Sequence, residues 1–170
     1  MKLFNTKVIA RCAIIGGLYV VLSLLTLPVA SGAIQFRLSE GLTLLPLLFP
    51  ESTIGLFVGC LLCNLISGLP FAEIIFGSLV TLLAGGFTLV IKYCRLNLSL
   101  KIIIGGLFPV LLNAFLLPLI WIYCYGALQN AYIVGALFLV ISQAVAVYLV
   151  GTFMVLGINK LKNKGLEFFN

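Results

Sequence analysis

Long apolar stretches, separated by short polar ones, are the main pattern along this chain. The apolar stretches cover approximately residues 8–28, 34–49, 53–69, 74–91, 102–122 and 131–159. A helix of about 20 apolar residues crosses the hydrocarbon core of a bilayer. The pattern therefore predicts an all-α integral membrane protein, a single domain over residues 1–170 that forms a bundle of six transmembrane helices.

The second stretch is unusual because it is short. Only ten residues separate Glu40 from Glu51, which corresponds to about 15 Å of α-helix, half of a bilayer core. A helix here can span only if it begins near Ile34. The pattern therefore predicts that Arg37 and Glu40 lie inside the second helix, toward one surface of the membrane.

Composition and charge support a membrane location. The chain is 63% hydrophobic and 8% charged, too apolar for a water-soluble domain of this length. Nine of its ten basic residues form three clusters at the ends of apolar stretches: Lys2, Lys7 and Arg11; Lys92, Arg95 and Lys101; Lys160, Lys162 and Lys164. Such clusters stay on the cytoplasmic side and contact lipid headgroups, so we expect cytoplasmic termini, a multi-pass protein of the plasma membrane, and no nucleic-acid partner.

The tenth basic residue and two acidic residues are the first candidates for chemistry. In the predicted topology Arg37, Glu40 and Glu73 all approach the outer face, although charge inside a membrane is costly. Arg37 and Glu40, spaced i,i+3, could simply neutralise one another on one helix face. Alternatively, the three groups line a polar pocket for a solute, an interpretation favoured because Glu73 comes from a separate segment.

Further polar and aromatic side chains are candidates for the same pocket. Each polar candidate could instead form a hydrogen bond between helices, and the aromatic ones could form a belt at the headgroup level. The candidate substrate-binding residues are Gln35, Arg37, Glu40, Asn64, Glu73, Asn113, Trp121, Tyr125 and Gln143.

Two other patterns concern small residues. Cys60 and Cys63 form a C-x-x-C pair, but the chain contains no histidine and no second pair, so we interpret them as packing residues and predict no metal site. Ala10, Ala13 and Gly17 lie on one stripe of the first predicted helix. Small residues allow close approach of another helix, either within the bundle or from a partner protein.

The stretch GAIQFRLSEGLTLLPLLFPE, residues 32–51, resembles the queuosine-precursor transporter family (QueT). GLFVGCLLCNL (55–65) and IIFGSLVTLLA (74–84) are similar to the same family. These proteins are substrate-binding S components of energy-coupling factor (ECF) transporters. The resemblance implies a six-helix bundle with an outward solute cavity. It also implies docking through small residues of the first helix, here Ala13-x-x-x-Gly17, to a transmembrane coupling subunit that carries two ATPase subunits.

The resemblance also implies a 7-deazaguanine base as substrate, with the 7-aminomethyl form favoured. A carboxylate can accept two hydrogen bonds from a guanine-like edge, and a second can pair with the aminomethyl cation. The chain has no phosphate-binding loop, so we expect no cofactor and no enzymatic activity in this chain, with ATP used by the partner subunits. An S component for another vitamin and a small membrane assembly protein without a solute remain as alternatives.

Overall fold

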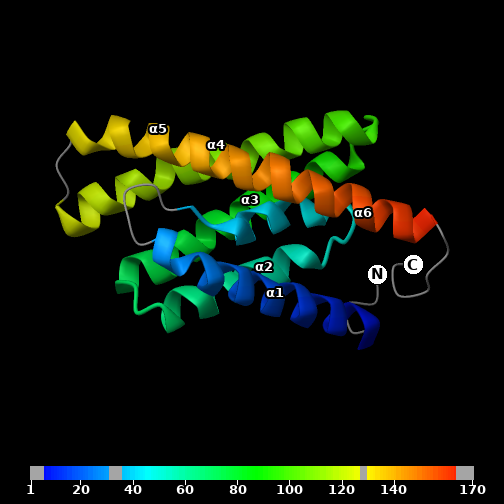
Figure 1. Cartoon of the computed structure of the whole chain (residues 1–170), viewed down its shortest axis with the longest axis horizontal. Helices are drawn as coiled ribbons and strands as arrows, with labels where there is room; N and C mark the ends of the chain where they lie inside the picture. Colours follow the sequence, from blue (N-terminus) through cyan, green and yellow to red (C-terminus); the bar gives the residue numbers. More distant parts are fainter. Residues whose placement is uncertain (1–5, 31–35, 127–129, 164–170) are drawn as a thin grey trace.

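The computed structural model describes residues 6–30, 36–126 and 130–163, and these residues form helices with no strand among them. Six elements are α-helical, one is a 3₁₀ helix and two are π-helical turns (Figure 1). In chain order they are α1 (Thr6–Ala30), η1 (Leu38–Leu47, 3₁₀), α2 (Ser52–Ile66), η2 (Glu73–Gly77, π), α3 (Ser78–Tyr93), α4 (Leu98–Tyr125), α5 (Asn130–Ala144), η3 (Val145–Gly151, π) and α6 (Thr152–Asn163). The all-α prediction is confirmed.

Four helical stretches in the described part of the chain are long and apolar enough to cross a membrane. They are Thr6–Pro28, Glu73–Tyr93, Leu98–Cys124 and Tyr132–Lys162. The last of these joins α5, η3 and α6 into one continuous rod. The protein is therefore a multi-pass membrane protein, whereas the prediction of six crossings stays a prediction because α2 is a shorter apolar helix and η1 is shorter still.

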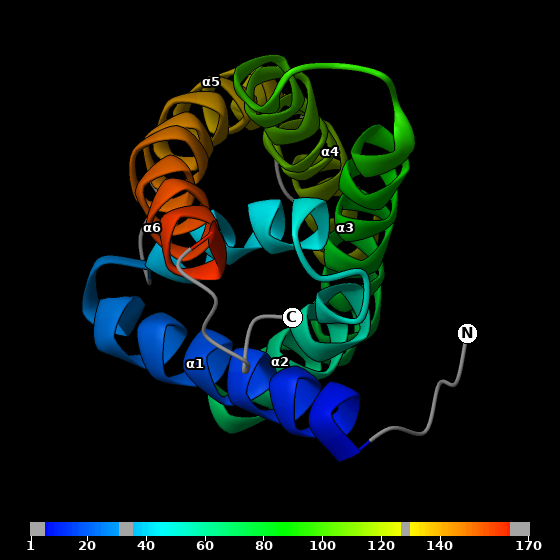
Figure 2. The same cartoon turned by 90° about the vertical axis from the view of Figure 1, so that its right-hand side faces the viewer.

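The 3₁₀ helix η1 is the centre of the bundle. Every residue from Ser39 to Leu47 is buried, and η1 contacts α1, α2, α3, α4, η3 and α6. Seen end-on, it crosses the interior of the ring formed by the longer helices (Figure 2). A 3₁₀ helix rises about 2.0 Å per residue against 1.5 Å for an α-helix, so the same ten residues cover about 20 Å instead of about 15 Å.

The expected α-helix over 34–49 is therefore wrong in type and in its start. Arg37 precedes η1 in an extended conformation, with φ −122° and ψ 111°, so it is not inside the helix with Glu40. Residue 34, where the helix was expected to begin, is outside the described residues. The remaining five predicted segments coincide with α1, α2, η2–α3, α4 and the α5–η3–α6 rod.

Close backbone crossings hold η1 and α1 against their neighbours. A Cβ atom at Gly151 of η3 would lie 2.5 Å from the carbonyl oxygen of Gly41 in η1. On the other side of the bundle, a Cβ at Gly55 of α2 would lie 2.6 Å from the carbonyl oxygen of Cys12, and one at Gly59 would lie 2.7 Å from that of Gly16. Gly55 and Gly59 form a G-x-x-x-G pair, the pattern that lets two membrane helices touch backbone to backbone.

This packing leaves the predicted docking stripe of α1 on the outside. Ala10, Ala13 and Gly17 are exposed, and a Cβ at Gly17 would meet no atom within 4 Å. Gly16, the neighbouring residue, is buried against α2 instead. The stripe therefore does not serve the α1–α2 contact, and its role in binding a partner stays a prediction.

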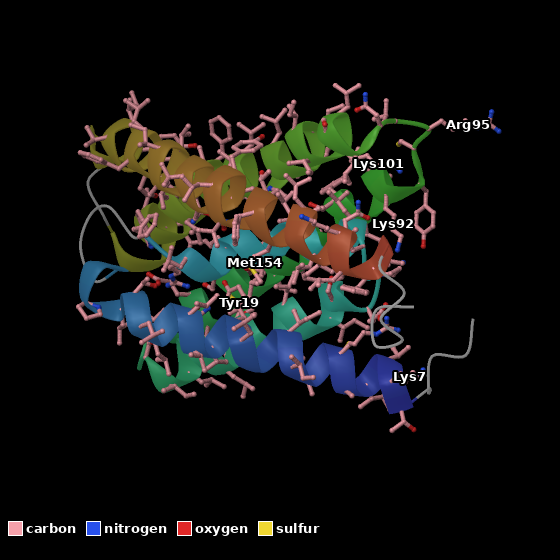
Figure 3. All side chains as sticks on the ribbon, turned by 45° about the vertical axis from the view of Figure 1, so that its right-hand side comes forward. Lys7, Tyr19, Lys92, Arg95, Lys101 and Met154 are labelled. Carbon is pink, nitrogen blue, oxygen red and sulfur yellow. The ribbon has the colours of Figure 1, made fainter. Side chains whose placement is uncertain are left out.

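Lys7, Lys92, Arg95 and Lys101 lie at the same end of the bundle, which we call the basic end, with Lys7 across that end from Arg95 (Figure 3). Lys92 Nζ donates a hydrogen bond to the carbonyl oxygen of Leu48, just after η1, at 2.8 Å, and Lys101 Nζ donates to the carbonyl oxygen of Lys92 at 2.6 Å. The C-terminal end of η1 therefore points to the basic end, and its N-terminal end points away from it. That the basic end is cytoplasmic stays a prediction.

Candidate solute-binding site

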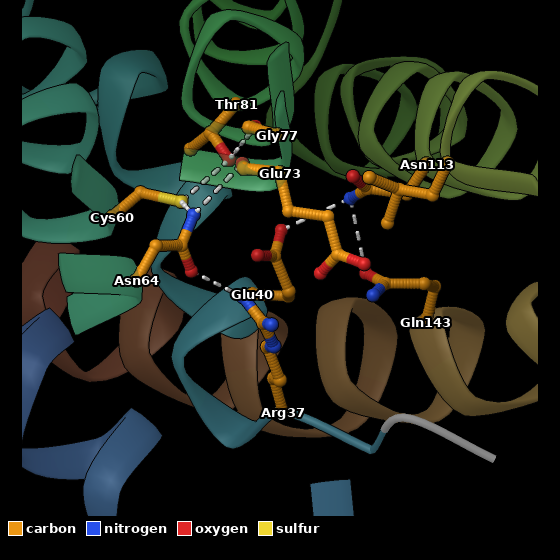
Figure 4. A pocket seen from close by; sticks show the side chains of 10 residues that line it. Arg37, Glu40, Cys60, Asn64, Glu73, Gly77, Thr81, Asn113 and Gln143 are labelled. Atoms are coloured by element: carbon orange, nitrogen blue, oxygen red, sulfur yellow. Dashed lines mark hydrogen bonds between the residues drawn. The ribbon is translucent and has the colours of Figure 1, made fainter. Parts of the chain in front are cut away.

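A small polar cavity lies near the N-terminal end of η1, on the side away from the basic end. Its volume is about 20 Å³. Five parts of the chain contribute to it: the start of η1, α2, the η2–α3 helix, α4 and α5. The lining residues are Arg37, Glu40, Cys60, Asn64, Glu73, Gly77, Thr81, Asn113, Leu117 and Gln143 (Figure 4).

The structure brings together most of the residues that the sequence suggested for a pocket. The predicted residues that line the cavity are Arg37, Glu40, Asn64, Glu73, Asn113 and Gln143. Gln35 is outside the described residues, and the side chain of Tyr125 is not described. Trp121 is not among the residues that line this cavity. It lies one helical turn beyond Leu117 on α4, and a Cβ at Gly135 would be 3.5 Å from its ring carbon Cζ3, so the indole packs against α5.

Glu40 is the most enclosed charged group of the site, with 3% of its surface exposed. Its two carboxylate oxygens accept hydrogen bonds from different helices. The Tyr19 hydroxyl of α1 donates to Oε1 at 2.5 Å, and Asn113 Nδ2 of α4 donates to Oε2 at 3.1 Å. Donors of this kind compensate a buried carboxylate for the water it has lost.

Arg37 binds a neighbouring helix rather than Glu40. Its Nη1 donates to Asn64 Oδ1 of α2 at 3.1 Å. Within the described residues, Arg37 and Glu40 form no ion pair, while Arg11 Nε and Glu51 Oε1 lie 2.9 Å apart at the basic end. The two side chains are therefore not joined by a direct ion pair on one helix face, the arrangement that one alternative from the sequence described, because the backbone at Arg37 is extended.

Glu73 enters the site from the opposite wall. It is the first residue of the π-helical turn η2, and its half-buried side chain reaches into the space beside Glu40, Asn113 and Gln143 (Figure 4). The Glu73 carbonyl oxygen accepts a hydrogen bond from Asn64 Nδ2 at 3.4 Å. A π turn admits an extra residue into a helix and changes the direction of its side chains, and such turns are frequent at functional sites.

Amide side chains connect these charged groups. Asn64 accepts from Arg37 and donates toward Cys60 Sγ at 3.5 Å. Asn113 Nδ2 is shared between Glu40 and Gln143 Oε1, the latter at 3.4 Å. The amides Asn64, Asn113 and Gln143 are all buried. These amides form hydrogen bonds between segments of the bundle, which was one alternative from the sequence. They also line the cavity, which was the other alternative.

Sequence reasoning missed several residues of the site. Cys60 and Thr81 line the cavity, with the Thr81 hydroxyl 3.4 Å from Cys60 Sγ, and Tyr19 is fully buried behind Glu40. Helical spacing from the candidate residues could have found two of them, because Cys60 is one turn before Asn64 and Thr81 is two turns after Glu73. No local signal points to Tyr19, since its partner is 21 positions away.

The cavity suits recognition of a polar solute by hydrogen bonding and charge. It is lined by one guanidinium, two carboxylates, three amides, a hydroxyl and a thiol. Its volume of about 20 Å³ accommodates roughly one water molecule. A larger solute therefore fits only after lining side chains move, and the half-buried Glu73 is the lining carboxylate with the most room to do so.

A charged polar cavity enclosed by apolar helices of a multi-pass protein is typical of membrane proteins that handle polar solutes. The model of the QueT transporter family matches residues 9–160, and the chain belongs to this family. The match confirms the resemblance found in residues 32–51 and identifies a transporter family rather than an enzyme family. Comparisons with curated proteins and with solved structures found no match.

Proposed function

We propose that this protein is the substrate-binding S component of an ECF-type importer in the plasma membrane and that it takes up a queuosine precursor. The substrate would be a 7-deazaguanine base, with 7-aminomethyl-7-deazaguanine favoured. Membership in the QueT transporter family supports the transport role. The observation that carries the substrate class is that Glu40 and Glu73, from separate elements, line one cavity together with Arg37.

The chemistry of the base matches these groups. A guanine-like edge presents a ring N–H and an exocyclic amine side by side, and one carboxylate can accept from both. Glu40, deeply buried and already oriented by two donors, suits this edge because an ionised carboxylate still has free acceptor positions. Glu73 is half-buried, so it can pair with the aminomethyl cation at a smaller desolvation cost. Arg37 and the amides can donate to the carbonyl oxygen of the base.

Partner subunits would supply the energy in this proposal. Ala10, Ala13 and Gly17 are exposed on α1, and their small side chains permit close approach of a helix from the coupling subunit. ATP would be used by the two ATPase subunits bound to that coupling subunit. This chain would need no cofactor of its own.

The test is binding by the purified chain to a panel of bases that differ in one group. The panel contains 7-aminomethyl-7-deazaguanine, its uncharged 7-cyano analogue, guanine and an unrelated vitamin. We expect the aminomethyl base to bind most tightly. Glu73→Gln should weaken its binding by about ten- to a hundredfold, because a hydrogen bond to a charged group contributes about 1.5–3 kcal/mol.

The matched control is Glu51→Gln, the same change at the carboxylate that pairs with Arg11 at the basic end. It should leave affinity for every base unchanged. Glu73→Gln should also reduce the preference for the aminomethyl over the cyano base, because the removed charge would pair only with the amine. Equal affinities of wild type and Glu73→Gln for the aminomethyl base would refute this assignment, and tight binding of the unrelated vitamin alone would refute the substrate class.

A further inference from the structure

Tyr19 forms the shortest hydrogen bond to the buried carboxylate of the cavity, although it is not one of the lining residues. Its side chain is 0% exposed, and its hydroxyl donates to Glu40 Oε1 at 2.5 Å. The bond joins α1 to the start of η1. Since Tyr19 is behind Glu40, a solute in the cavity would contact Glu40 and not Tyr19.

Tyr19 lies where α1 packs closely against α2. A Cβ atom at Gly59 of α2 would lie 2.9 Å from the Tyr19 Cβ, so only glycine leaves this space for the tyrosine. One turn further along α1, Ser23 Oγ donates to Ser39 Oγ of η1 at 2.6 Å. Two hydrogen bonds, four residues apart on α1, therefore tie the same face of this helix to neighbouring residues of η1.

Glu40 is thus held from two sides. Tyr19 fixes Oε1 and Asn113 fixes Oε2, which leaves the carboxylate little rotational freedom. A carboxylate that is oriented before the ligand arrives loses less conformational entropy on binding. Removing the Tyr19 hydroxyl would leave the carboxylate held at Oε2 alone and so less firmly oriented.

We propose that Tyr19 is a positioning residue for solute recognition, acting through Glu40 by holding that carboxylate in its binding orientation. The inference rests on the proposed function, in which Glu40 contacts the base. It adds that affinity depends on α1, a helix that contributes no side chain to the lining of the cavity. A purely structural tyrosine would change stability without changing affinity through Glu40.

A double-mutant cycle on affinity tests this proposal. The four proteins are wild type, Tyr19→Phe, Glu40→Gln and the double variant, and the probe is 7-aminomethyl-7-deazaguanine. We expect Tyr19→Phe to weaken binding about tenfold in the wild-type background and by less than about twofold when Glu40 is already Gln. The control is Tyr148→Phe, which removes a hydroxyl that donates to the Ile103 carbonyl oxygen at 2.8 Å and should not change affinity.

A second cycle keeps the test decisive if Glu40→Gln does not fold. Tyr19→Phe and Asn113→Ala remove the two donors of one carboxylate, so their effects on affinity should be non-additive. Additive effects in whichever of the two cycles can be measured would overturn the inference even if the wild type binds the base. Unchanged affinity in Tyr19→Phe would overturn it as well.

Failure of the proposed function would be recognised separately. In that case the wild type binds no base of the panel, and the positioning role falls with the proposed function because Glu40 then has no base to recognise. If the wild type binds the base but the cycle shows no coupling between Tyr19 and Glu40, the proposed function stands and only the positioning role is overturned.

Discussion

The crossing of η1 and η3 offers a sharp test of this architecture, through the substitution Gly151→Ala. A Cβ atom at this position would lie 2.5 Å from the Gly41 carbonyl oxygen and 3.0 Å from Leu44 Cδ1. The first of these is a backbone atom of a fully buried helix, so it cannot turn away as a flexible side chain would. The added methyl group must therefore push η1 and η3 apart.

The magnitude follows from two opposing effects. Replacing glycine by alanine inside a helix is favourable by up to about 1 kcal/mol. Overpacking a close contact costs about 1–3 kcal/mol. Gly157→Ala on α6, where a Cβ would meet nothing within 4 Å, contains only the favourable effect. The difference between the two variants isolates the clash, and at about 2–4 °C per kcal/mol we expect Gly151→Ala to melt about 2–12 °C below Gly157→Ala.

The assay is thermal unfolding of both variants in the same detergent, followed by ligand affinity. Because Glu40 is adjacent to Gly41 on η1, displacement of η1 should also weaken solute binding in Gly151→Ala but not in Gly157→Ala. Equal melting temperatures and equal affinities in the two variants would refute the close crossing of η1 and η3.

Two further predictions concern the outer face of α1 and the topology. Gly17→Leu should abolish assembly with a coupling subunit, measured by co-purification, while solute binding by the isolated chain persists. Gly16→Leu should instead lower the melting temperature, because a Cβ there is 2.9 Å from the Gly55 carbonyl oxygen. Loss of solute binding in Gly17→Leu would assign the stripe to internal packing. In a cysteine-free background, an impermeant thiol reagent added outside cells should label Phe71→Cys but not Lys101→Cys, and the reverse result would invert the topology.

The sequence by itself determined the class of protein and the course of its helices. Apolar length and the spacing of basic clusters are local properties, and they predicted helices close to α1, α2, α3, α4 and the α5–η3–α6 rod. The scarcity of charge was informative in the same way. Because so few ionisable groups are tolerated in a membrane, the positions of Arg37, Glu40 and Glu73 along the chain were enough to select them as a site, and all three line one cavity.

Only the tertiary structure decided how these groups are held. Residues 38–47 form a 3₁₀ helix that is buried from Ser39 to Leu47 and crosses η3 at Gly41, an arrangement that no propensity within the segment reveals. The extended backbone at Arg37 directs its guanidinium to Asn64 rather than to Glu40. Tyr19 reaches Glu40 because α1 packs closely on α2 at Gly59. Each of these contacts joins residues distant in sequence, so local pattern could not determine the partners.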